Sequence, residues 1–97
     1  MPDYRVYRGG RLIGTLTRTD GDMPWENGTF KPAAGFAAVR KLFDRERALL
    51  DADRMDEWEA AWEEIAAPGL RLVPVAGGEE ITDFVLHIDG STAWWRY

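Results

Sequence analysis

Apolar and polar positions alternate near the start of the chain, as they do in β-strands. Residues 4–18 place two β-rich runs around Gly9 and Gly10, a pair that is typical of a hairpin turn. A two-residue loop there would set Arg8 opposite Arg11, which is unfavourable. We therefore predict a hairpin in which either the register shifts or both arginines point into solvent.

Residues 19–32 show no regular apolar period. Glycine, asparagine-glycine and proline signals are dense in this segment, so it is predicted to be an irregular loop. The segment also contains Met23, Trp25 and Phe30, three large apolar side chains that need packing partners.

Helical spacing of apolar residues dominates the middle of the chain. A first helix is predicted over residues 33–52. A second is predicted to begin near Asp53 or Asp56 and to end at Pro68-Gly69. Their apolar stripes comprise Phe36, Val39, Leu42, Phe43, Leu49 and Leu50 in the first helix, and Met55, Trp58, Trp62 and Ile65 in the second.

The last third of the chain returns to strand patterns. Residues 70–75 read as a strand, and Pro74 within it indicates an edge position or a bulge. Gly77-Gly78 then turns the chain, and Asp89-Gly90 is the strongest hairpin signal in the sequence.

If Asp89-Gly90 is the two-residue loop, a register for the last hairpin follows. Adjacent strand residues point to opposite faces, so Trp95 is expected in the core and Trp94 on a second face. The predicted pairs are Ile88–Ser91, Leu86–Ala93 and Phe84–Trp95 on an apolar face, and Asp83–Arg96, Val85–Trp94 and His87–Thr92 on a more polar one.

The predicted element order is β-β-α-α-β-β-β. Separate runs of strands and helices with tight hairpins favour the α+β class. We expect a single domain over residues 1–97, with an antiparallel sheet of about five strands and two helices packed on one face.

Composition narrows the functional classes. The chain has no cysteine, which excludes disulfides and thiolate metal sites, and its net charge of −5 argues against nucleic-acid binding. It shows neither an apolar run long enough to span a bilayer nor a secretory signal pattern, so we expect a cytoplasmic protein without membrane partners. Ten arginines against two lysines suggest a GC-rich bacterial genome.

The segment around the single histidine suggests a hydrolytic triad. His87, Asp89 and Ser91 are the residue types that such a triad needs. However, the predicted hairpin points His87 and Ser91 to opposite faces. We therefore interpret His87 as a packed or surface residue.

Three acidic residues suggest a calcium loop. Asp20, Asp22 and Glu26 have roughly suitable spacing, but Pro24 and Trp25 stand where an EF-hand requires an oxygen ligand and a glycine. The sequence therefore predicts no metal site, no catalytic residue and no cofactor.

Surplus aromatic residues indicate a contact surface. Tryptophan and arginine dominate binding hot spots, so Trp25 and Trp94 would mark such a surface if both were exposed. Arg96 and Asp83 would lie beside Trp94 in the predicted hairpin. The alternative is that Trp25 folds back over an edge of the core.

An acidic helix is the second candidate surface. Residues 51–64 carry seven carboxylates against Arg54, and Glu59 and Glu63 are like charges four residues apart. Such a face either aids solubility or docks a basic partner.

These features favour a small non-enzymatic protein-binding or accessory domain, with self-association as one mode of partnership. One alternative is a small-ligand binder or enzyme with a pocket between sheet and helices near Trp25, Tyr7 and His87. Another alternative is a toxin-neutralising protein of the immunity type, which shares the small size and acidity of this chain.

Overall fold

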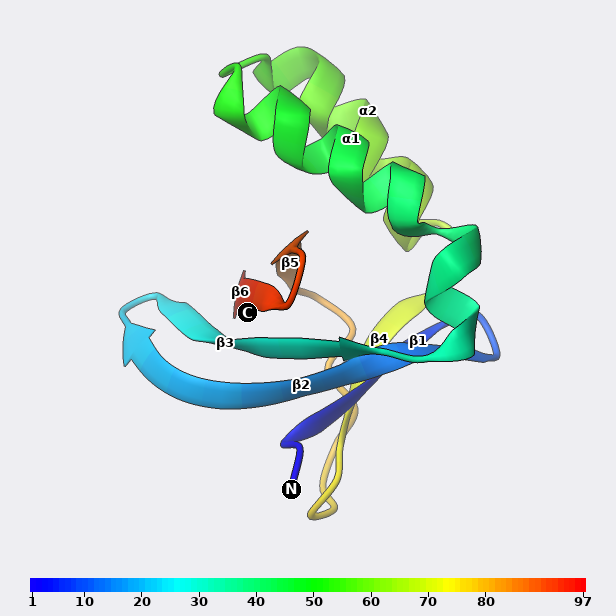
Figure 1. Ribbon diagram of the computed structural model, residues 1–97, viewed down its shortest axis with the longest axis vertical. Coiled ribbons are helices and arrows are strands. Elements are labelled where there is room, and N and C mark those ends of the chain that lie inside the picture. The colour runs from blue at the N-terminus through cyan, green and yellow to red at the C-terminus, as the bar shows by residue number, and fades with distance from the viewer.

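The computed structural model describes residues 1–97, which form an antiparallel sheet with helices against it (Figure 1). The strands are β1 (Tyr4–Arg8), β2 (Arg11–Asp22), β3 (Trp25–Pro32), β4 (Leu70–Pro74), β5 (Val85–Asp89) and β6 (Thr92–Arg96), and the helices are the 3₁₀ helix η1 (Ala34–Ala38), α1 (Arg40–Asp51) and α2 (Met55–Ala66). The sheet order is β4-β1-β2-β3-β6-β5. The predicted α+β class is confirmed, with six strands, and β4 is an edge strand as Pro74 indicated.

In the first hairpin, Arg8 forms hydrogen bonds with helix α2. Arg8 does lie opposite Arg11 in the β1–β2 register. Its guanidinium donates hydrogen bonds to the backbone carbonyls of Ile65, at 2.9 Å, and Glu64, at 3.0 Å. Carbonyls in the last turn of a helix lack partners within the helix, so Arg8 caps the C-terminal end of α2.

The predicted loop over residues 19–32 is wrong, because this segment forms the second hairpin. β2 continues to Asp22, and β3 pairs with it from Trp25 onward. Gly28 is a packing residue inside β3 and not a turn signal, since a Cβ there would lie 2.1 Å from the Thr17 carbonyl oxygen. Of the apolar residues in this segment, Phe30 is buried, whereas Met23 is 93% exposed.

Gly28→Ala is expected to lower the free energy of unfolding by about 3 kcal/mol, because the methyl group has to push β2 and β3 apart. Gly10→Ala is the matched control, since nothing lies within 4 Å of a Cβ there. We expect that control to stay within about 0.5 kcal/mol of the wild type. Urea denaturation of both variants measures the difference, and equal stabilities would contradict the close approach at Gly28.

The single helix predicted over residues 33–52 is divided in two. η1 brings Gly35 against β2, where a Cβ would lie 2.4 Å from the Leu12 carbonyl oxygen. α1 begins only after Val39, whose φ of −120° and ψ of −1° are not helical. The division lets η1 pack against β2 while α1 packs against β5. α2 lies within one to three residues of its predicted bounds.

The last hairpin turns one residue later than predicted. Asp89 pairs with Thr92, and Gly90 and Ser91 form the loop, with φ of +63° at Gly90. A turn with Asp89 as its first loop residue would need a positive φ at that residue, whereas Gly90 takes this conformation without strain. The six predicted pairs are therefore wrong, and the observed pairs are Val85–Arg96, Leu86–Trp95, His87–Trp94, Ile88–Ala93 and Asp89–Thr92.

In the observed pairing, each residue of that hairpin lies opposite a residue two positions away from its predicted partner. Because the shift is by two residues, each side chain stays on its predicted face of the sheet. Trp95 is fully buried, as predicted, and Trp94 lies on the opposite face. Tyr4 meets Trp95 edge to face at 6.3 Å between ring centroids. Burial, together with the hydrogen bond to Tyr97, raises the pKa of Tyr4 to about 12.

The core joins the sheet to the helices. Its members are Val6, Ile13, Leu16, Phe30, Phe36, Val39, Phe43, Ile65, Leu70, Leu72, Phe84, Leu86, Ile88, Ala93 and Trp95. No helix in the chain combines the length and the apolar character that crossing a bilayer requires. Both faces of β5 are covered although it is an edge strand, because Leu86 and Ile88 enter the core while His87, on the opposite face, is only 2% exposed.

Candidate functional site

Three strands bring polar and aromatic residues together on the face of the sheet opposite Trp95. In the register, Asn27 of β3 lies opposite Trp94 of β6, and Trp94 lies opposite His87 of β5. Trp25 lies two residues before Asn27 and therefore on the same face. Segments far apart in the sequence thus form one row across the sheet.

His87 lies among indole rings. Its ring centroid is 5.4 Å from that of Trp25 and 5.3 Å from that of Trp94. Trp58 of α2 approaches to 6.3 Å. Because Trp25 and Trp94 are half-buried, this aromatic cluster covers the histidine while leaving part of two indoles open to solvent.

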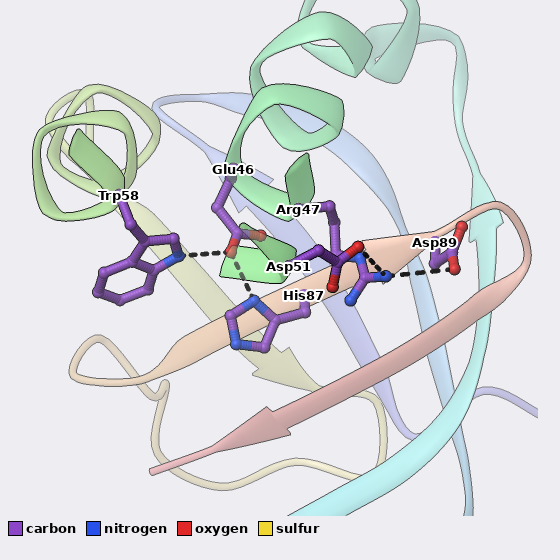
Figure 2. A network of polar contacts seen from close by, with 6 residues as sticks. All are labelled: Glu46, Arg47, Asp51, Trp58, His87 and Asp89. Carbon is purple, nitrogen blue, oxygen red and sulfur yellow. Dashed lines mark hydrogen bonds and ion pairs between the residues drawn. The ribbon is translucent and has the colours of Figure 1, made fainter. Parts of the chain in front are cut away.

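A carboxylate of α1 holds the histidine in place (Figure 2). Glu46 is completely buried, and its Oε2 lies 2.7 Å from His87 Nδ1 and 2.6 Å from the indole nitrogen of Trp58. An indole N–H is only a donor, so Oε2 accepts from Trp58. When Nδ1 of His87 carries a proton, the same Oε2 also accepts from it.

This arrangement leaves the second ring nitrogen of His87 free. In Figure 2, Nε2 points away from Glu46, and no protein group forms a hydrogen bond with it. If Nδ1 carries the proton of a neutral ring, Nε2 carries a lone pair and is an acceptor. Glu46 therefore selects the tautomer that offers an acceptor on the far side of the ring.

The network carries a cost in stability. Oε1 of Glu46 is buried and has no hydrogen-bond partner in the protein. Leaving a buried polar atom unpaired is destabilising, and a buried charge destabilises further unless it is fully paired. Buried polar atoms without a partner break a general rule of protein structure, and such exceptions are typical of functional sites.

Arg47 closes one side of the aromatic cluster. Its guanidinium carbon lies 4.4 Å from the ring centroid of Trp94. The same group pairs with Asp51 at 3.3 Å and with Asp89 at 3.5 Å (Figure 2). The positive charge of Arg47 is therefore compensated from both α1 and β5.

Arg96 plays a similar part at Trp25. Its guanidinium carbon lies 5.4 Å from the ring centroid of that tryptophan, and Arg96 itself is exposed. Each of the two tryptophans is thus contacted by one guanidinium group of the protein. These cation–π contacts help to hold the two indoles in place.

A pocket of about 400 Å³ opens beside this cluster. Its size falls within the range of small-ligand and side-chain sites, about 300–1,000 Å³. The lining residues are Asp22, Trp25, Asn27, Leu50, His87 and Trp94. Aromatic walls, one aliphatic residue and a few convergent polar groups form the kind of lining that binds ligands.

The structure brings together some of the residues predicted to bind a partner. Trp25, Trp94 and Arg96 share one face, as described above. Asp83 precedes β5 and is exposed, and it makes no ion pair with Arg96, because Arg96 lies opposite Val85.

The other predicted residues lie elsewhere. Glu59 and Glu63 are exposed on α2 and do not line the pocket. Tyr7, which was expected near Trp25 and His87, instead packs beneath Arg71 of β4, whose guanidinium carbon lies 4.7 Å from its ring centroid. The acidic helix and the aromatic pocket are therefore separate features.

Glu46 is the residue that sequence reasoning missed, and a signal for it exists. It lies three residues after Phe43 and four before Leu50, in the middle of the apolar stripe of α1. A charged residue at such a position has to be buried with partners or distort the helix packing. Its partner, His87, is the one histidine in the chain.

Comparison of the chain with protein-family models, with curated proteins and with solved structures gave no match. The geometry of the pocket is therefore the basis for a functional assignment.

Proposed function

We propose that this protein is a non-enzymatic binding domain that holds a side chain of a partner protein in the pocket beside Trp25, His87 and Trp94. The observation that carries the proposal is the buried His87, whose Nε2 has no hydrogen-bond partner in the protein and whose ring centroid lies 5.4 Å and 5.3 Å from those of two half-buried indoles. Tryptophan at a partly open pocket is typical of binding hot spots. A hydrogen-bonding group at the base of such a pocket provides specificity.

The residue types in the pocket favour binding over covalent catalysis. Its lining contains no hydroxyl, thiol or amine side chain that His87 would activate as a nucleophile. A partner protein is favoured over an enclosed small molecule because Trp25 and Trp94, which line the pocket, are only half-buried. Their exposed surface is available to further residues of a partner chain.

Trp94→Ala is expected to weaken partner binding by about thirtyfold or more, because a hot-spot tryptophan supplies about 2 kcal/mol or more. Peptides selected from a random display library on the wild-type protein serve as probes. Their dissociation constants are then measured with the wild type and with the variant by fluorescence anisotropy.

Tyr7→Ala is the matched control. Tyr7 is half-buried and lies beneath Arg71, much as Trp94 lies beneath Arg47, but on another part of the sheet. We expect this variant to keep wild-type affinity. If both variants lose affinity equally, or if no peptide is selected, the proposed function is wrong.

A further inference from the structure

We infer that the group entering the pocket is a guanidinium, the side chain of an arginine on the partner protein. This inference rests on the proposed function and names the chemistry that the same pocket recognises. Three independent features of the pocket lead to it: the polarity of its hydrogen-bonding groups, the behaviour of its indoles and the balance of its charges.

The pocket offers acceptors. In the neutral tautomer in which the Nδ1–H of His87 donates to Glu46, Nε2 presents a lone pair. The carboxylate of Asp22 is an acceptor only, and the amide of Asn27 supplies a carbonyl oxygen. A ligand that satisfies this set must bring several N–H donors, and a guanidinium has five in one plane.

The indoles of this face already stack with guanidinium groups. Arg47 lies 4.4 Å from the centroid of Trp94, and Arg96 lies 5.4 Å from that of Trp25. A planar, weakly hydrated cation suits an indole face better than a compact ammonium does. The protein therefore provides, in its own contacts, an example of the chemistry expected of the ligand.

The charges around the pocket favour a cation. Arg47 is compensated by its two carboxylate partners, which leaves Arg96 as the one unpaired positive charge nearby. Asp22 is the one carboxylate that lines the pocket, and it makes no ion pair within the protein, whereas Asp51 and Asp89 are both paired with Arg47. An acidic side chain would meet repulsion here, whereas a basic one is attracted.

The test uses three peptides, Gly-Ser-X-Ser-Gly with blocked ends, where X is arginine, citrulline or lysine. Citrulline keeps the shape of arginine and removes its charge. Indole N–H resonances of Trp25 and Trp94 in the ¹⁵N-labelled protein report binding. We expect saturable shifts with the arginine peptide and affinity about tenfold lower with citrulline, since hydrogen bonds to charged groups are the stronger ones.

The outcomes separate the two proposals. Equal affinity for citrulline or lysine overturns the guanidinium inference. If display-selected peptides without arginine bind at the two indoles while the arginine peptide does not, the inference also fails but the proposed function stands. If neither the test peptides nor any selected peptide shifts these resonances, both proposals fail.

Asp22→Asn sharpens the experiment, because Asp22 is exposed at the end of β2 and its replacement leaves the core intact. We expect about fivefold weaker binding of the arginine peptide and a smaller loss for the citrulline peptide, which has no charge to pair with Asp22. Glu59→Gln removes the same charge from α2, outside the pocket, and should change affinity less than twofold. If Asp22→Asn and Glu59→Gln weaken binding of the arginine peptide equally, the net charge of the protein attracts the peptide and Asp22 does not contact it. That result would overturn the inference.

Discussion

Trp95→Ala is expected to lower the free energy of unfolding by about 3–5 kcal/mol, whereas Trp94→Ala should cost about 1 kcal/mol. Trp95 is fully buried among core residues of several strands, so its removal creates a large cavity. Trp94 is half-buried on the opposite face and loses chiefly its contacts with Arg47 and His87. Adjacent identical side chains thus differ in effect because a strand points them in opposite directions.

Urea denaturation followed by far-ultraviolet circular dichroism measures both tryptophan variants, because this signal does not depend on indole fluorescence. If Trp95→Ala does not fold, Trp95→Phe replaces it, and we expect it to lie between the wild type and the alanine variant. Similar losses at positions 94 and 95 would contradict the two-faced arrangement of β6.

Glu46→Ala is expected to lower the free energy of unfolding by about 3–5 kcal/mol, the range for breaking a buried charge-assisted network on one side. The change leaves the Trp58 N–H and the His87 Nδ1–H without an acceptor inside the protein. Glu46→Gln should cost clearly less, because the amide oxygen still accepts a hydrogen bond. Both variants are measured by urea denaturation.

A double-mutant cycle with His87→Ala isolates the contact itself. Residues in one buried network show coupling energies of about 0.5–3 kcal/mol, and we expect a value within this range for Glu46 and His87. If the stability of the Glu46→Ala variant lies within about 0.5 kcal/mol of the wild type, the buried pair does not form. A coupling energy of zero would lead to the same conclusion.

The C-terminal hairpin shows how much a local pattern predicts. Alternation placed Trp95 in the core and Trp94 on the second face, and both placements are confirmed. The exact pairing was wrong, because it depended on which residue first adopts a positive φ, and the loop is Gly90-Ser91. A shift of two residues keeps every face, so the error in register left the location of the aromatic surface unchanged.

The β2–β3 hairpin shows where local signals mislead. Gly28 looks like part of an asparagine-glycine turn, yet it lies inside β3 because β2 and Trp95 of β6 approach too closely for any side chain. The nearest contact is with Thr17 of the neighbouring strand β2, but the contact with Trp95 joins segments more than 60 residues apart, as Gly28 and Ala93 pair in the sheet. No window of neighbouring sequence contains this information.

Residue periodicity and composition alone were sufficient for the fold class, the two helices, the hairpins at both ends and the opposed directions of Trp94 and Trp95. These properties depend on neighbours along the chain, where spacing and turn chemistry act directly. The surroundings of His87 could not be predicted from local sequence, because the residues that meet there lie on four different elements. These residues are Glu46, His87, Trp25 and Trp58. Burial of Glu46 against His87 depends on how α1 packs along β5, and packing between distant segments is a property of the whole chain in three dimensions.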